Sequence, residues 1–350
     1  MKDVKAYLRY LFRSNNLATF CIGNCENGME TVLSNFINLT DTVLVGVIGE
    51  TGKQAANYIT QRIGAKVHIL RTYAGKALEI EDIDNHLKAD PTKVFFLVHG
   101  ECSTGVLQPI NKIGELCHKY DCMFMVDVSN TIGCVDVSTD KYKIDVAFAI
   151  SQKAFDGLND LIPITISSFG LTKLEQSRMH STSNLNDLRQ IAEIWMSNDE
   201  TEFIYSKFVN APSLNSLRDR LFAIQNEQLS NVIDRHITNS KRLQHDIENS
   251  IGLELFVTRK EHRLPSMIAV CIPSRISEHF FSKISTERFP LEVLPGVGET
   301  LGLIIRINLT TRKATKKIVK DFVRSFYQTM ETLTPNYGIK NSDLYTNIYY

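Results

Sequence analysis

The sequence predicts an α/β fold, in which a mostly parallel central sheet is sandwiched between helices and followed by a smaller C-terminal α+β domain. The first half contains short apolar runs such as "VFFLV" (94–98) and "MFMVDV" (123–128), which have the length of strands. These runs are apolar throughout, as is typical of strands buried on both faces of a parallel sheet. Segments with helical spacing of apolar residues separate them, which is the pattern of β-α-β units.

The elements expected in the first half follow from these patterns. A first helix is predicted because apolar residues recur there at helical spacing, at Val4, Tyr7, Leu8, Leu11 and Phe12. The expected strands are 18–23, 41–49, 65–71, 93–100, 122–128, 145–151 and 162–170. Most are followed by an amphipathic segment; the first of these places Met29, Val32, Leu33 and Phe36 on one face.

After about residue 170 the pattern becomes helical. One long amphipathic helix is expected from about Ser213 to Asn249. The expected elements of the tail are a strand at 266–272, a helix at 277–285, strands at 291–296 and 301–309, and a helix from about 315 to 333. The chain shows no repeat and no linker rich in Pro or Gly, so we predict two domains, 1–225 and 226–350, packed as one unit.

Composition excludes several classes of function. Lys plus Arg and Asp plus Glu both number 39, so no net charge attracts nucleic acid or an anionic membrane. The apolar runs are far shorter than the ~20 residues that a membrane span needs. Residues 1–15 predict an amphipathic helix and no signal peptide, and "NIYY" is no peroxisomal signal. The cysteines are odd in number, seven, with no Cys-x-x-Cys, so a reducing cytoplasm is expected.

Several common motifs are absent. The sequence has no Walker A motif, no Gly-x-Gly-x-x-Gly after a strand and no Gly-x-Ser-x-Gly. His99, Glu101 and Cys102 lie close together but alternate around a strand end, so a metal ion there would need distant ligands. We therefore expect no metal site at these three residues.

Polar residues follow three of the predicted strands at their carboxyl ends, where ligands bind in open α/β sheets. "HGECSTGVLQP" (99–109) follows one strand, Asp127 ends another, and "SQK" (151–153) ends a third. A lysine and a carboxylate in this arrangement suit pyridoxal phosphate (PLP), whose aldehyde binds a lysine and whose ring nitrogen needs an acidic partner. The other interpretation is that Asp127 and Lys153 are ordinary charges at strand ends.

A family resemblance bears on this choice. The segments "FFLVHGECSTGVLQPINKIGELCHKYDCMFMVDVSNTIG" (95–133), "IDVAFAISQKAF" (144–155), "HRLPS" (262–266) and "LPGVGETLGLIIRINL" (294–309) resemble the class V aminotransferases. The group that they resemble comprises the alanine–glyoxylate, serine–pyruvate and 3-hydroxykynurenine transaminases. The resemblance covers nearly the whole chain. It implies a PLP-dependent transferase of fold type I, a homodimer with its active sites at the subunit interface.

The resemblance assigns roles to five residues. Lys153 takes the place of the lysine that binds PLP covalently, and Gln152 lies beside it as in the family. Asp127 takes the place of the partner of the pyridine nitrogen. Tyr205 falls where a tyrosine of the neighbouring subunit reaches the cofactor phosphate. Arg306 falls where an arginine binds the substrate α-carboxylate, a bidentate task that suits its planar fork.

Other cofactor-binding positions depart from the family pattern. The phosphate-binding turn contains Asn24, Cys25 and Glu26, is one residue shorter, and has Glu26 in place of a histidine. A carboxylate repels a phosphate, although the amide groups of a helix N-terminus could still bind it. Cys102 replaces a serine that contacts the phosphate and is a weaker donor. Thr51 replaces the aromatic residue that stacks on the pyridine ring.

Further departures concern the subunit interface, the turn after Lys153 and the place where the similarity to the family begins. Phe208 stands where a small hydroxyl residue is usual, and "DGLND" (156–160) replaces an Ala-Pro-Pro-Gly turn. The similarity begins inside the second N-terminal helix of the family, so the segment that helps to line the substrate pocket is missing. The covalent and charge-pair residues are thus kept, whereas most phosphate and stacking contacts are lost.

Two hypotheses about function follow. The first is a PLP-dependent transaminase that moves an amino group from a small amino acid, such as alanine, serine or one like 3-hydroxykynurenine, to a 2-oxo acid such as glyoxylate or pyruvate. The second is an inactive transaminase homologue that acts as a binding or regulatory protein. The retained residues favour PLP chemistry with weakened or altered activity, in a homodimer that binds neither nucleic acid nor membrane.

Overall fold

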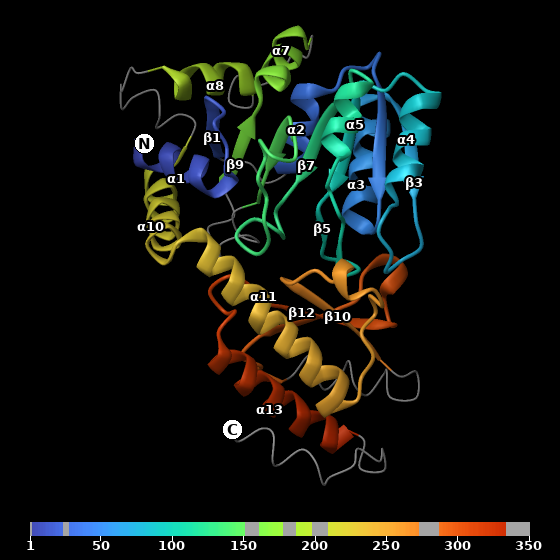
Figure 1. Ribbon diagram of the computed structural model, residues 1–350, viewed down its shortest axis with the longest axis vertical. Helices are drawn as coiled ribbons and strands as arrows, with labels where there is room; N and C mark the ends of the chain where they lie inside the picture. Colours follow the sequence, from blue (N-terminus) through green and yellow to red (C-terminus); the bar gives the residue numbers. More distant parts are fainter. Residues whose placement is uncertain are drawn as a thin grey trace.

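A computed structural model describes residues 2–23, 28–150, 161–177, 187–197, 209–272 and 287–333, and its main feature is a central sheet (Figure 1). The strand order is β1-β9-β8-β7-β4-β2-β3. Strands β8, β7, β4, β2 and β3 are parallel, whereas β9 runs antiparallel to both neighbours. The strands are β1 (Ala18–Gly23), β2 (Thr42–Val47), β3 (Lys66–Arg71), β4 (Val94–Val98), β7 (Met123–Asp127), β8 (Val146–Phe148) and β9 (Leu161–Ile166). The predicted mostly parallel sheet is therefore confirmed.

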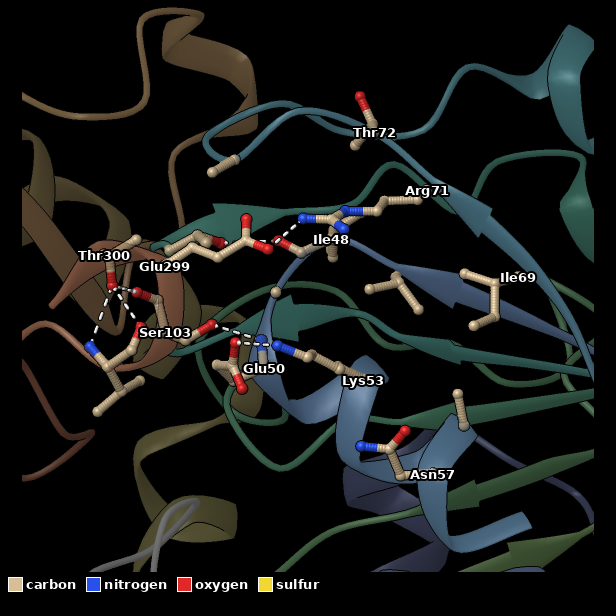
Figure 2. Close-up of a pocket in the computed structure, with 16 residues that line it drawn as sticks. Ile48, Glu50, Lys53, Asn57, Ile69, Arg71, Thr72, Ser103, Glu299 and Thr300 are labelled. Carbon is tan, nitrogen blue, oxygen red and sulfur yellow. Dashed lines mark hydrogen bonds and ion pairs between the residues drawn. The ribbon is translucent and has the colours of Figure 1, made fainter. Parts of the chain in front are cut away.

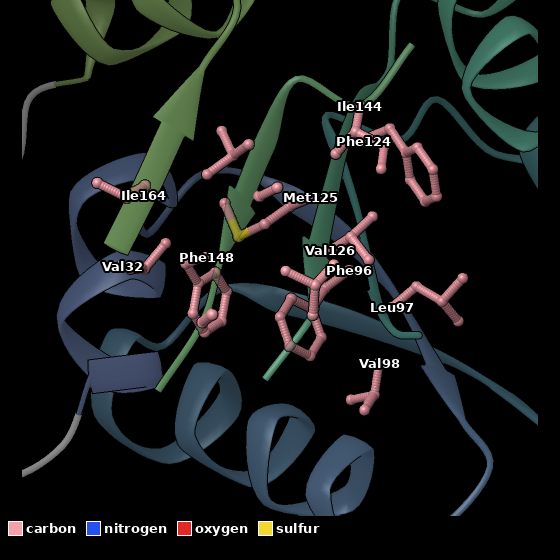
Figure 3. Packing of buried hydrophobic residues seen from close by; sticks show 14 of the residues in the cluster. Val32, Phe96, Leu97, Val98, Phe124, Met125, Val126, Ile144, Phe148 and Ile164 are labelled. Atoms are coloured by element: carbon pink, nitrogen blue, oxygen red, sulfur yellow. The ribbon is translucent and has the colours of Figure 1, made fainter. Parts of the chain in front are cut away.

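Both faces of this sheet are covered, because every residue of β4 and β7 is buried. Successive residues of a strand point to opposite faces. Phe95 stacks on Phe124 with ring centroids 5.8 Å apart, and the next residue, Phe96, stacks on Phe148 at 6.4 Å. Figure 3 shows Phe96 and Phe148 side by side on one face of the sheet. Each face thus has its own aromatic pair, as expected for strands that are apolar throughout.

Helices that accompany the central sheet are α1 (Lys2–Phe12), α2 (Gly28–Phe36), α3 (Glu50–Tyr58), α4 (Ile80–Ala89), α5 (Ile113–Lys119), α7 (Ser168–Gln176) and α8 (Leu188–Met196). Helix α3 continues as a π-helical turn, η1 (Ile59–Ile63). The predicted first helix is confirmed, since Val4, Leu8, Leu11 and Phe12 of α1 are buried. Among the described helices, none combines the length and the apolar character needed to cross a membrane.

One predicted strand extended into a helix. The expected strand 162–170 ends at Ile166, and α7 begins at Ser168. The reason is the Ser167 side chain, which accepts a hydrogen bond from the amide of Gly170 at 3.0 Å. Serine in this position caps a helix because it satisfies an amide that has no partner within the helix.

The prediction of a single helix from Ser213 to Asn249 was wrong. The segment forms α10 (Ala211–Glu227) and α11 (Leu229–Asp246), followed by a π-helical turn, η3 (Ile247–Ile251). Gln228 separates them with a φ of +67°. Leu217 and Leu221 of α10 belong to the core of the central sheet, whereas Leu243 of α11 belongs to a second core. The change of direction lets the two helices reach both cores (Figure 1).

The second core lies between a small antiparallel sheet and two helices. The sheet order is β10-β12-β11, with β10 (Met267–Cys271), β11 (Glu292–Pro295) and β12 (Ile304–Asn308). Helices α11 and α13 (Lys316–Leu333) pack against each other beside it (Figure 1). Short elements complete the described part: the hairpin β5 (Gly100–Glu101) and β6 (Val106–Leu107), and the 3₁₀ turns η4 (Lys260–His262) and η5 (Gly298–Thr300). The helix expected at 277–285 lies outside the described residues, and the domain boundary at 225/226 stays a prediction.

Candidate active site

The carboxyl ends of β4, β7 and β8 meet at one edge of the central sheet. The residue pairs Val98–Asp127 and Asp127–Phe148 lie opposite each other in the parallel ladder. The turn after β4 and the segment after β8 therefore start on either side of Asp127. This is the edge at which ligands bind in open α/β sheets.

Asp127 ends β7 with its side chain buried, at 3% exposure. Its Oδ1 accepts a hydrogen bond from the amide of Ser129 at 2.8 Å. The hydroxyl of Ser129 in turn accepts one from the amide of Ile150 at 2.9 Å. Asp127 is thereby tied to the chain immediately before residues 151–160. Buried carboxylates persist in proteins when such donors hold them.

His99 lies beside Asp127 and is neutral at pH 7. Its backbone amide donates to the Asp127 carbonyl at 3.0 Å, and its Nδ1 lies 3.0 Å from the Thr131 hydroxyl. That hydroxyl donates to the Val128 carbonyl at 3.2 Å, so it accepts from His99 and places the ring proton on Nδ1. Burial lowers the pKa of His99 to about 4.

Glu101 and Thr51 form a buried contact at the amino end of α3. The Thr51 amide and hydroxyl donate to the Glu101 carboxylate at 3.1 and 2.9 Å. The amide and hydroxyl of Ser103 donate to the same carboxylate at 3.0 and 2.8 Å. Thr51, predicted at the ring-stacking position, therefore has its hydroxyl held by Glu101 and offers no aromatic face.

Arg306 projects from β12 and is buried, with 8% exposure. Its Nε donates to the carbonyl of Pro295 at 2.8 Å, and its Nη1 donates to the carbonyl of Cys102 at 3.1 Å. No carboxylate lies within ion-pair distance of Arg306 in the part of the chain that the structure describes. A buried guanidinium with only neutral acceptors is a strong site for an anion.

The remaining predicted site residues lie outside the described residues. They are Asn24, Cys25, Glu26, Gln152, Lys153 and Tyr205, together with Phe208. Of the predicted residues that are described, the structure brings Cys102 to Arg306 through its backbone carbonyl, and it places Thr51 against Glu101. Ser129 and Ser103 were missed by sequence reasoning. Their signal was weak, since each is only a serine two residues from a predicted acidic group.

A pocket of about 210 Å³ lies next to this region, between α3, the end of β3 and η5 (Figure 2). Its lining includes Glu50, Ser103 and Thr300, whereas Asp127 and Arg306 are not part of it. Two ion pairs line it: Lys53 pairs with Glu50 at 3.4 Å, and Arg71 pairs with Glu299. The pocket therefore lies at the carboxyl ends of β2 and β3, lined by α3 and Ser103, and does not include Asp127 or Arg306.

Comparisons with known proteins agree with this geometry. The family model "Aminotransferase class-V" matches residues 1–288. The alanine–glyoxylate aminotransferase of Drosophila melanogaster is 35% identical over 317 residues, covering 90% of this chain and 80% of that protein. The Mus musculus enzyme of the same name is 30% identical over 337 residues, covering 96% of this chain and 81% of that protein.

Solved structures lead to the same family. The alanine–glyoxylate aminotransferase of Nostoc sp. superposes with a TM-score of 0.87 at 29% identity, covering 94% of this chain and 86% of that one. The ureidoglycine–glyoxylate aminotransferase of Bacillus subtilis has a TM-score of 0.87 at 28% identity, covering 99% and 88%. The chain belongs to the class V aminotransferase family, with the fold of the PLP-dependent type I transferases.

Proposed function

We propose that this class V aminotransferase uses pyridoxal phosphate to move an amino group from a small amino acid to a 2-oxo acid such as glyoxylate or pyruvate. The observation that carries the proposal is Arg306, a buried guanidinium whose described acceptors are two backbone carbonyls. An α-carboxylate would supply the missing counter-ion in a bidentate geometry. The names of the relatives support a glyoxylate-type acceptor.

Among the described residues predicted to contact the cofactor, Asp127 fits it. Asp127 is a buried carboxylate at the carboxyl end of a central strand, with one oxygen held by the Ser129 amide. When bound, PLP supplies an aldehyde that links to amines and a ring that withdraws electrons. The Asp127 carboxylate would hold the proton on the ring nitrogen. Lys153 would bind the aldehyde and carry the substrate α-proton as base and acid, a role that stays a prediction.

Arg306 would orient the substrate. Its two hydrogen bonds to carbonyls fix the plane of the guanidinium and use two of its five N–H groups, so three N–H groups in that plane remain for a substrate. A carboxylate bound there would be held before the proton transfer begins. The second hypothesis, a homologue that has lost activity, draws on Thr51, which replaces a stacking ring and is bound to Glu101. The two differ in whether the cofactor binds at all.

Cofactor binding separates these hypotheses. Purified protein mixed with PLP is expected to develop visible absorbance from the lysine-bound cofactor, and Lys153→Ala should abolish it. The matched control is Lys173→Ala, which removes a lysine of α7 that lies 3.4 Å from Asp121. The control should keep the absorbance. Absence of the band in the unchanged protein at saturating PLP would contradict the transaminase proposal and support the inactive homologue.

Arg306→Lys is expected to raise the KM for the amino donor by about ten- to a hundredfold. Lysine cannot hold the carbonyls of Pro295 and Cys102 and a carboxylate together in one plane. Steady-state kinetics at saturating PLP measures the change. Arg235→Lys is the control, because Arg235 also donates to carbonyls, at Thr311 and Ala314, but on α11. An equal change in both variants would show that the effect is not substrate binding.

A further inference from the structure

The carboxylate of Glu101 is fully buried and receives four hydrogen bonds. Its Oε1 accepts from the hydroxyls of Thr51 and Ser103 and from the Ser103 amide, at 2.8 to 3.0 Å, and its Oε2 accepts from the Thr51 amide at 3.1 Å. Within the described residues no cation pairs with it. The positive end of the α3 dipole stabilises this charge in place of a cation.

Ser103 extends this contact to the small antiparallel sheet. Its hydroxyl accepts from the amide of Glu50 at 2.9 Å, and its carbonyl accepts from the buried hydroxyl of Thr300 at 3.2 Å. Figure 2 shows Ser103 between Glu50 on α3 and Thr300 in η5. Gly298 in η5 has a φ of +57°, and a Cβ there would overlap the Glu50 carboxylate. The segment before β12 is thus packed directly on Glu50 and Ser103, and Ser103 binds the Glu101 carboxylate.

Glu101 also begins the tight turn that presents Cys102. The turn closes through a hydrogen bond from the Gly105 amide to the Glu101 carbonyl at 2.9 Å. Gly105 has a φ of +71°, and a Cβ there would lie 2.9 Å from that of Ala269 on β10. The packing of Gly105 and the two hydrogen bonds from Ser103 to the Glu101 side chain fix the turn. The carbonyl of Cys102, in the middle of it, accepts from Arg306.

We propose that Glu101 is a positioning residue for substrate recognition. Its carboxylate holds the 101–105 turn so that the Cys102 carbonyl points at Nη1 of Arg306, and this sets the orientation of the guanidinium. The inference rests on the proposed role of Arg306 as the carboxylate site. Through Thr51, the same carboxylate joins the amino end of α3 to that turn. The buried Glu101 carboxylate therefore links the residues at the carboxyl ends of the central strands to Arg306 of the smaller sheet.

The test is Glu101→Gln. The amide has the same shape as the carboxylate, but it turns an NH₂ group toward hydrogen-bond donors, so the turn should shift. The KM for the amino donor should therefore rise about tenfold, whereas kcat should change less than about threefold. Ser103→Ala, a milder change, should raise KM about threefold. In the double variant with Arg306→Lys, Glu101→Gln should add little to KM, because both changes act through one guanidinium.

Asp145→Asn is the matched control, since Asp145 is also a buried carboxylate with several donors, but at the opposite edge of the sheet. It should lower stability and leave KM unchanged. A crystal structure of the Glu101→Gln protein supplies a readout besides activity: the distance from Arg306 Nη1 to the Cys102 carbonyl should exceed 3.5 Å. An unchanged distance, or an unchanged KM in an active protein, overturns the inference. If the unchanged protein shows no transamination, the proposed function fails, and the crystallographic distance alone decides the role of Glu101.

Discussion

Asp127→Asn is expected to lower kcat by about a hundred- to a thousandfold at saturating PLP. The Ser129 amide requires an acceptor, so the asparagine carbonyl would keep this bond and its NH₂ group would replace Oδ2. A donor would then face the ring nitrogen of the cofactor, where a protonated nitrogen needs an acceptor. The asparagine could then not hold a proton on the ring nitrogen, and the cofactor would supply much less of its electron-withdrawing chemistry. The measurement is kcat for amino transfer with each variant.

The control for this prediction is again Asp145→Asn. Asp145 is 1% exposed and accepts from His118 Nε2, the Ser167 hydroxyl and the Phe124 amide at 2.8 to 3.0 Å. Removing its charge should destabilise the protein without changing kcat. Retention of more than a tenth of the original kcat by Asp127→Asn would show that this carboxylate is not the partner of the ring nitrogen.

Acid is expected to destabilise the fold through two buried histidines before most carboxylates titrate. Burial lowers the pKa of His99 and of His236 from 6.5 to about 4. His236 donates from Nε2 to the Leu309 carbonyl at 2.8 Å, and its Nδ1 has no partner among the described residues. Protonation would therefore place an uncompensated charge in the core of the smaller sheet.

The sign of the effect follows from proton binding. Between pH 6.5 and about 4 the unfolded chain binds a proton on each histidine and the folded chain does not, so the free energy of unfolding falls as the pH falls. The stabilisation is complete above pH 6.5. Between pH 7 and pH 5 each histidine should lower the free energy of unfolding by about 2 kcal/mol. Urea unfolding at pH 7, 6 and 5 measures this loss.

His236→Gln isolates one contribution, because glutamine can keep a donor for the Leu309 carbonyl and does not titrate. The free energy of unfolding that this variant loses between pH 7 and 5 should be smaller by about half of the loss that the two histidines cause together. In the control, His245→Gln, an exposed side chain is replaced, and the pH dependence should follow that of the unchanged protein. A His236→Gln protein with unchanged pH dependence would refute the assignment.

The strands and their polar ends were predictable because the signals are local. The apolar runs at 94–98 and 123–127 formed β4 and β7 as expected, and Asp127 is at the end of its strand. Arg306 lies between apolar residues of β12 and is itself buried, at 8% exposure. Helix ends were less predictable, because the periodic spacing of apolar residues indicates neither the cap at Ser167 nor the break at Gln228.

The partners of the site residues could not be predicted, because they depend on contacts between distant parts of the chain. Arg306 and Cys102 are 204 positions apart, and Thr51 and Glu101 are 50 apart. In the sequence, Glu101 was visible only as a member of a cluster with His99 and Cys102, and Cys102 was also predicted to contact the cofactor phosphate. In the structure the side chains of His99 and Glu101 have different partners, and the Cys102 backbone carbonyl contacts Arg306.

The sequence by itself indicated the family, the order of the strands along the chain and the lysine, aspartate and arginine that are candidate site residues. It could do so because apolar periodicity and motif order are properties of neighbouring residues. Only the tertiary structure decided that the Glu101 carboxylate joins α3 to the turn that holds Arg306. That assignment requires four donors to converge on one buried charge, and convergence is created by packing, not by spacing along the chain.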